Sequence, residues 1–299
     1  MTKEKFRTIR LNNANSEMLK TISDIVEEYG KDGYKLTLRQ LYYQLVSRDI
    51  IANKTKEYVK LSILLVKGRM AGLIDWDAIE DRNRVPFIPY WVVNIEDAIN
   101  DTIKQYRLDR QRGQKNYIEV WVEKDALSGI LKRITSHYHI KLMSNKGYSS
   151  CTAIHDAFIR FKREERSGKK TIILYIGDYD PSGLDMIRDI DKRLTEFGVH
   201  TKVIPIGLTM KQINKYKPPP NPAKITDPRA KWYIAEHGKT SWEVDSLNPK
   251  TLHELVEHNV EKLIDMDLFK ERISQEERDK EKLRKIINED KVQDDEDDD

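Results

Sequence analysis

Two short apolar runs, each followed closely by acidic residues, constrain the fold of this chain most strongly. Residues 172–176 and 117–122 have the β-branched and aromatic content of central parallel strands. Asp178 and Asp180 come just after residues 172–176, and Glu123 directly follows residues 117–122. Because helical stretches alternate with these strands, the sequence predicts an α/β fold with a mainly parallel sheet.

These three acids are candidates for a metal site, since ligands of open α/β sheets bind beyond the carboxyl ends of the strands. Mg²⁺ in particular is usually held by one or two carboxylates. The sequence therefore predicts Mg²⁺ bound by Glu123, Asp178 and Asp180. The alternative is that the aspartates only cap a helix that starts near Leu184, and that Asp125 is a partner of a helix dipole.

The N-terminal part of the chain predicts three short helices with apolar spacing. They cover residues 15–29, 38–47 and 55–70, and a turn over residues 75–84 follows them. Such a set is typical of a winged-helix module, whose third helix enters the major groove of duplex DNA. Basic residues expected to neutralise phosphates lie on that helix, although a solvated face is the alternative; they are Lys56, Lys60, Lys67 and Arg69.

The order of elements in the middle of the chain resembles that of a known domain. Glu123 after a strand, a strand over residues 141–144, a glycine loop over residues 145–150 and the pair Asp178 and Asp180 follow one another as in Toprim domains. Toprim domains occur in topoisomerases, primases and certain nucleases. The resemblance covers about residues 115–210 of this chain. It implies a Rossmann-like domain with Mg²⁺, and we expect Lys146 of the glycine loop to contact DNA.

Within that superfamily, the chain is most similar to the A subunit of topoisomerase VI and to the meiotic double-strand-break protein. The stretch Thr37-Leu-Arg-Gln-Leu-Tyr-Tyr43 resembles their nucleophile motif, which implies that Tyr43 attacks DNA. A phenol is a weak nucleophile until a cation, base or metal stabilises the phenolate. Arg39, one helical turn earlier, supplies such a cation. The alternative is that Tyr42 and Tyr43 are packing residues, one buried and one half exposed.

Charge and composition indicate how the chain is divided. The expected parts are a winged-helix domain (1–96), a basic linker helix (97–114), a Toprim domain with a C-terminal extension (115–270), and a charged helix with a disordered acidic tail (271–299). The net charge is +3, but the last eleven residues contribute −7, so the rest of the chain carries +10. This basic body favours a nucleic-acid partner.

Three further residues receive structural interpretations. Cys151, the single cysteine, excludes an intrachain disulfide and a multi-cysteine zinc site, and is expected to be a small buried residue. Glu243 and Asp245 lie where the Toprim-like region ends, and we expect them to be helix caps or surface acids; the alternative is that they support the metal ligands.

The resulting prediction is an enzyme that cleaves duplex DNA by Mg²⁺-dependent tyrosyl transesterification, like a type IIB topoisomerase. One tyrosine per chain for two DNA strands predicts a homodimer, and the resemblance implies that Tyr43 of one chain works with the acids of the other. No glycine-rich nucleotide loop is present in the sequence, so an ATPase is expected only as a separate subunit.

Two other functions stay open at this point. The chain is alternatively a Toprim nuclease that hydrolyses DNA or RNA without a tyrosyl intermediate, or a non-catalytic DNA-binding factor. No apolar stretch approaches the ~18 residues that span a bilayer, so we expect a soluble, cytoplasmic protein without a membrane partner.

Overall fold

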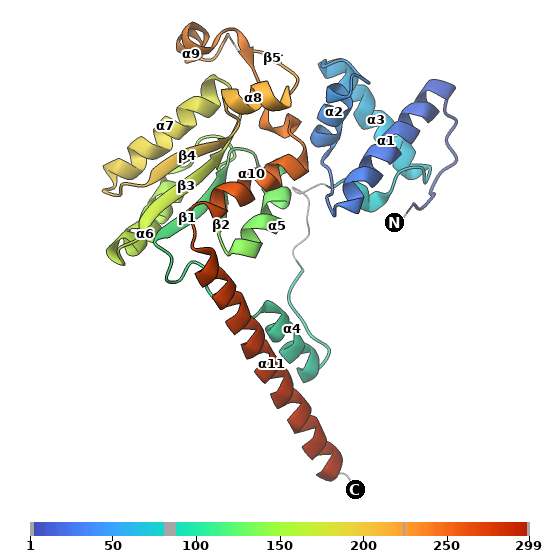
Figure 1. The fold of residues 1–299 in the computed structure, drawn as a ribbon. Helices are drawn as coiled ribbons and strands as arrows, with labels where there is room; N and C mark the ends of the chain where they lie inside the picture. The colour runs from blue at the N-terminus through green and yellow to red at the C-terminus, as the bar shows by residue number, and fades with distance from the viewer. Residues whose placement is uncertain (1–2, 81–87, 224, 298–299) are drawn as a thin grey trace.

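The computed structural model is an α/β chain with a helical N-terminal domain, a sheet domain and a long C-terminal helix (Figure 1). It describes residues 3–80, 88–223 and 225–297, and the side chains as far as residue 285. Within these ranges, none of the helices combines the length and the apolar character needed to cross a membrane.

Three helices form the N-terminal domain, as predicted. They are α1 (Asn13–Lys31), α2 (Leu38–Ser47) and α3 (Thr55–Met70). Thr37 and Gln40 form a capping box that fixes the start of α2. A short 3₁₀ helix, η1 (Trp76–Ala78), follows α3. Part of the turn expected after α3 falls on residues 81–87, which lie outside the described residues.

Four parallel strands form the main sheet in the order β2-β1-β3-β4. They are β1 (Asn116–Val122), β2 (Lys141–Ser144), β3 (Lys170–Ile176) and β4 (Lys202–Gly207). β1 and β3 are direct neighbours, with Val122 opposite Ile176 at their carboxyl ends. This confirms an α/β fold with a parallel sheet. A small antiparallel pair, β5 (Asn221–Pro222) and β6 (Thr240–Ser241), lies apart from it.

Helices cover both faces of the sheet (Figure 1). One face packs against α6 (Cys151–Arg166) and α7 (Pro181–Glu196), and the other against α5 (Ser128–Tyr138) and α10 (Pro249–Glu261). Because side chains alternate along a strand, Trp121 joins the first core and Val120 joins the second. Shorter elements complete the domain: η2 (Asp125–Leu127), α8 (Met210–Tyr216), α9 (Ala230–His237) and η3 (Val244–Ser246).

A buried ion pair explains the acidic residue inside β1. Glu119 is fully buried, and Arg160 of α6 binds it through two hydrogen bonds of 2.7 and 2.9 Å. The Tyr117 hydroxyl and the Trp121 indole donate to the same carboxylate at 2.8 and 3.0 Å. Since its charge is paired and its oxygens are bonded, Glu119 is a structural residue of the core.

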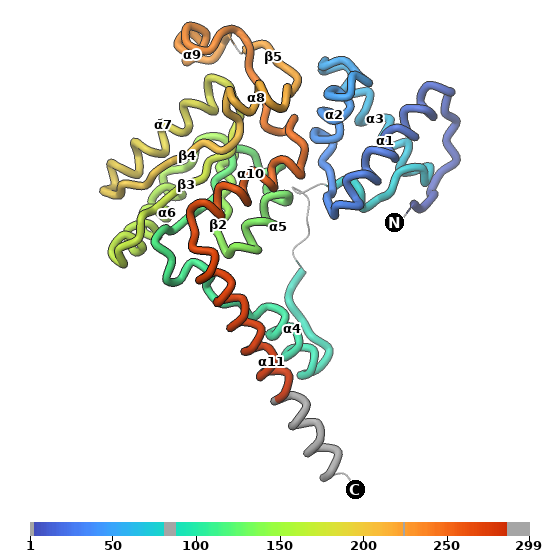
Figure 2. Tube along the Cα trace, viewed as in Figure 1, coloured from blue at the N-terminus to red at the C-terminus, as the bar shows by residue number. Residues whose placement is uncertain are grey.

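The C-terminal helix α11 (Met266–Asp297) extends away from the sheet domain, and α4 (Ile95–Gln105) lies beside it (Figure 2). The predicted linker helix over residues 97–114 was therefore too long. Beyond Gln105 the chain is not helical, because Glu276 of α11 binds the backbone N–H of Leu108 and the guanidinium of Arg110.

The disorder predicted for the acidic tail stays a prediction, because the structure does not describe the side chains beyond residue 285. One other expectation about this domain was wrong. Cys151 is exposed rather than buried, because it occupies the first position of α6, after the capping Ser150.

Candidate functional site

Two of the predicted acids meet at the carboxyl edge of the sheet. Since β1 and β3 are parallel neighbours, the residues that follow them emerge side by side. A carboxylate oxygen of Glu123 accepts a 2.9 Å hydrogen bond from the backbone N–H of Asp178. Asp178 in turn accepts a 2.9 Å bond from the backbone N–H of Val244. Both acids are buried, with only 9% and 8% of their surfaces exposed.

Asp180, the third predicted acid, caps a helix. Its Oδ1 accepts a 2.7 Å hydrogen bond from the backbone N–H of Gly183. With Pro181 in the first position, α7 starts three residues before the expected Leu184. Burial raises the pKa of Glu123, and the negative charge of Asp180 raises it further. Asp180 is therefore a cap that still acts electrostatically on the neighbouring acid.

A lysine lies among the acids, and the sequence analysis missed it. The ammonium of Lys124 is 2.8 Å from Asp178, 3.1 Å from Glu243 and 3.6 Å from Asp245. Burial opposes its charge, but the three carboxylates outweigh burial and raise the pKa of Lys124. Lys124 is thus a built-in cation of the acid cluster.

Glu243 and Asp245, which were expected to be caps or surface acids, belong to this cluster instead. Asp245 is fully buried, and its Oδ2 lies 3.0 Å from the Arg39 Nε. Glu243 also pairs with the guanidinium of Arg39. The expectation failed because the partners of both acids come from distant parts of the chain. Arg39 on α2 thereby ties the N-terminal domain to the sheet domain.

Tyr43 lies at this junction and is enclosed. It is 4% exposed, and its ring is 6.0 Å from the Arg39 guanidinium. Burial and the charge of Glu243 raise the pKa of Tyr43 to about 12, although Arg39 and Asn221 favour the phenolate. Tyr42 is equally buried and donates a 2.9 Å hydrogen bond to Asn53. Both tyrosines therefore pack in the core, as the alternative expected, but neither is half exposed.

The predicted nucleophile and the predicted metal ligands are connected within a single chain. Arg39 pairs with Glu243, Glu243 with Lys124, and Lys124 with Asp178. The sequence analysis expected Tyr43 to meet the acids of another chain. In this structure Tyr43 lies beside the cluster of its own chain, and its pairing with the acids of a second chain stays a prediction.

The residues predicted to contact DNA differ in how available they are. Lys60 is paired with Glu57 at 2.8 Å on the exposed surface of α3, where Lys56 and Lys67 are also exposed. Lys146 is exposed and lies 3.8 Å from Asp125. Arg69 is different, because it stacks 4.4 Å over the Trp76 ring and donates to the Trp76 carbonyl. We therefore assign Arg69 to packing within the domain.

Carboxylates are the type of side chain that binds Mg²⁺, but those at the sheet edge are engaged with internal partners. In the ranges that the structure describes, no three His, Cys, Asp or Glu side chains are grouped closely enough to hold a metal ion. Both carboxylate oxygens of the buried Asp245 nevertheless lack an aligned hydrogen bond. Carboxylate oxygens are the ligands that Mg²⁺ prefers, and an excess of buried negative charge favours a cation.

Comparison with models of known families and with curated proteins gives no match. The likeness to topoisomerase VI A subunits therefore depends on the motifs around Tyr43, Glu123 and Asp178.

Gly183 keeps the backbone of Asp178 in place, and its replacement tests this. A Cβ at Gly183 would lie 2.2 Å from the Asp178 carbonyl oxygen, so the backbone must move. We expect Gly183→Ala to lower the free energy of unfolding by about 1–3 kcal/mol. Gly30→Ala is the matched control, because its Cβ meets nothing within 4 Å. Urea unfolding of both variants checks this, and equal stabilities would contradict the close approach.

The titration of Asp178 gives a pH-dependent stability. Burial raises its pKa to about 7, Lys124 opposes the shift and Glu123 adds to it. An unfolded Asp titrates near 3.9, so between about pH 4 and pH 7 the folded chain binds this proton more tightly. The Asp178 contribution to stability is therefore greatest at low pH and is lost as the pH rises through about 7.

We expect Asp178→Asn to remove this loss. Between pH 5 and pH 8, the free energy of unfolding of wild type should fall by roughly 1–3 kcal/mol more than that of the variant. Urea unfolding at the two pH values measures the difference, and Asp24→Asn, at an exposed position of α1, is the control. Parallel pH dependence of wild type and Asp178→Asn would contradict the assignment.

Proposed function

We propose that the chain binds duplex DNA and cleaves it by transesterification, with Tyr43 as the nucleophile. The observation that carries this proposal is the ionic connection between the Arg39–Tyr43 helix and the acids at the sheet edge. Residues more than a hundred positions apart meet there: Arg39 with Glu243, and Lys124 with the same Glu243. Arg39 comes from the nucleophile motif and Lys124 adjoins Glu123, whereas Glu243 lies outside both motifs.

Each residue has a role in the proposed reaction. The phenol oxygen of Tyr43 gives its proton to water and attacks a DNA phosphorus. A 5′-phosphotyrosyl bond forms as the bond to the 3′ oxygen breaks, and that oxygen takes a proton from water to become a 3′ hydroxyl. Arg39 favours the phenolate electrostatically. Glu123, Asp178 and Asp180 would hold Mg²⁺, which stabilises negative charge on a transferring phosphate when it is bound.

The arrangement described here is a closed one. Tyr43 is buried, and Arg39 pairs with Glu243 and Asp245 across the junction of α2 and η3. Attack on DNA therefore requires α2 to separate from η3, which exposes the phenol. When this separation moves Tyr43 away from the charge of Glu243, one cause of the raised pKa of Tyr43 is also removed.

The second candidate function is hydrolysis of nucleic acid without a tyrosyl intermediate. Burial of Tyr43 and its pKa of about 12 favour this candidate, because both disfavour a phenolate nucleophile. In that case Tyr43 only packs the junction between the two domains, and Glu123 and Asp178 carry the chemistry.

One experiment separates these functions. Supercoiled plasmid is incubated with the protein and Mg²⁺, the reaction is stopped with detergent, and the DNA is examined with and without protease. Transesterification gives cut DNA that carries protein until protease removes it. Hydrolysis gives cut DNA with free ends, and a non-catalytic factor leaves the plasmid supercoiled; either result rejects the proposal.

A further inference from the structure

Two apolar surfaces of this chain are open to water. The first is the extended segment of residues 88–95, which we call the strap; it leads into α4 (Figure 1). Its large apolar side chains are 69–79% exposed: Ile88, Tyr90, Trp91, Val93 and Ile95. A contiguous group of exposed apolar side chains is rare on a monomer and marks an interaction site.

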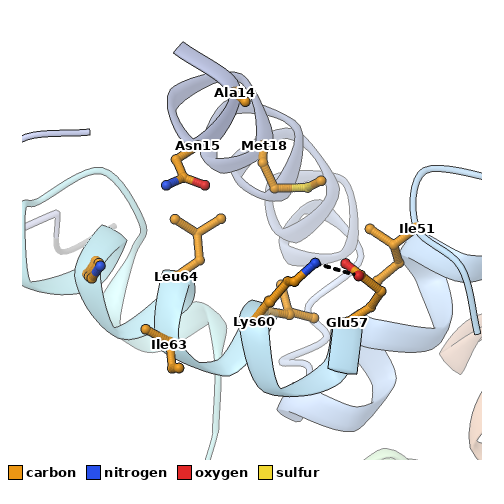
Figure 3. A pocket seen from close by; sticks show the side chains of 10 residues that line it. Ala14, Asn15, Met18, Ile51, Glu57, Lys60, Ile63 and Leu64 are labelled. Carbon is orange, nitrogen blue, oxygen red and sulfur yellow. Dashed lines mark hydrogen bonds and ion pairs between the residues drawn. The ribbon is translucent and has the colours of Figure 1, made fainter. Parts of the chain in front are cut away.

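The second surface is a groove between α1 and α3. It encloses about 330 Å³, and Figure 3 shows Met18 of α1 and Leu64 of α3 at its sides. Ile63 lies at its edge, and Val59 and Val66 extend the same face of α3; the three are 50–60% exposed. Pockets of about 300 Å³ or more hold ring-sized groups, so an indole fits here.

We propose that the strap of one chain docks into the groove of a second copy, and that the second strap docks reciprocally. Because the strap side chains are at least 69% exposed, none of them is seated in the groove of its own chain. Each copy carries one strap and one groove, so a two-fold axis satisfies both contacts at once and closes the assembly.

The area of the contact supports a stable pair. A buried aromatic side chain alone covers about 150–250 Å², so a seated strap with two aromatics buries on the order of 500 Å². Two straps in two grooves therefore bury on the order of 2,000 Å² in total, counting both partners. Specific protein interfaces bury about 1,200–2,000 Å², so this contact is large enough.

Charge also matches the strap to the groove. Lys60, Lys67 and Glu57 line the groove; Glu57 pairs with Lys60 at 2.8 Å, so the lining keeps a net charge of +1 from Lys67. The strap continues into the first turn of α4, which carries Glu96 and Asp97. Opposite charges at the edge of an apolar contact favour this pairing and fix its direction. Duplex DNA would account for the lysines, because basic and polar groups bind phosphates. It would not account for the exposed apolar side chains of α3.

Sedimentation of the full chain without DNA tests this proposal. We expect wild type at micromolar concentration to have twice the chain mass of 35.2 kDa. Trp91→Ser and Ile63→Ser should each reduce the mass to that of one chain. The matched controls are Trp232→Ser and Ile159→Ser, at other exposed sites (52% and 53%), and both should keep the wild-type mass.

Cross-linking then identifies the contact. Cys151 is the single cysteine, so Cys151→Ser gives a background without thiols. In that background, Trp91→Cys protein mixed with Ile63→Cys protein should form a disulfide between the two different chains. A monomeric wild type, an unchanged mass in both serine variants, or no mixed disulfide would overturn the proposal. If the serine variants keep their mass but lose DNA affinity, the apolar face of α3 binds DNA instead.

The proposal does not depend on the chemistry at Tyr43. The mass and cross-linking measurements need neither DNA nor cleavage. A failure of strap docking and a failure of transesterification are therefore seen in different experiments.

Discussion

Tyr43→Phe is expected to abolish the covalent link between protein and DNA. The substitution removes only the phenol oxygen, which is the atom that would bond to phosphorus. Loss of a nucleophile lowers the rate by roughly 10³-fold or more. The ring keeps its edge contact with Tyr42, so the fold should be preserved. The amount of DNA-linked protein after detergent treatment measures the effect.

Tyr42→Phe is the matched control for this prediction. Tyr42 is as buried as Tyr43 and lies beside it, but its hydroxyl binds Asn53 instead of facing Glu243. We expect Tyr42→Phe to keep a substantial share of the DNA-linked protein. If Tyr43→Phe still cuts DNA at the wild-type rate, the hydrolytic function takes the place of transesterification.

Asp178→Asn and Glu123→Gln are each expected to abolish Mg²⁺-dependent cleavage under either mechanism. Both substitutions keep the size of the side chain but remove a charged ligand. Changes to groups that only support metal ligands already cost about 10–100-fold, so loss of a ligand should cost more than about 100-fold. Nicking of supercoiled plasmid across a range of Mg²⁺ concentrations measures the loss.

Asp178→Asn also removes a carboxylate partner of the buried Lys124, so its urea unfolding is measured at the pH of the assay to separate loss of activity from loss of stability. Asp191→Asn, at an exposed position of α7, is the activity control. DNA affinity should stay near wild type in all three variants. Wild-type cleavage rates in Asp178→Asn or Glu123→Gln would mean that the acids at the sheet edge are structural.

Local patterns in the sequence were sufficient for the elements that position the site. The bounds of α2 and α3 agree with the predicted residues 38–47 and 55–70, because apolar spacing and the Thr37 cap are local signals. The convergence of Glu123 and Asp178 followed from two buried strands that pair in parallel. Only the adjacency of β1 and β3 was needed to bring these two acids together.

The rest of the site depends on contacts between distant residues. Lys124 meets Glu243 across 119 positions, and Arg39 meets it across 204. Neither contact leaves a periodic or spacing signal, so Glu243 and Asp245 were expected to be caps or surface acids. The contact of Arg69 with Trp76, only seven positions away, was also not foreseen, because it depends on how η1 folds back against α3.

Mass spectrometry of the cleaved complex tests the central claim most directly. Wild-type protein is reacted with plasmid DNA and Mg²⁺, denatured, and digested with nuclease and protease. The account predicts a peptide that carries a nucleotide through its 5′ phosphate on Tyr43. The same modification on Tyr42, or cut DNA with no modified tyrosine in the recovered peptides, would contradict it.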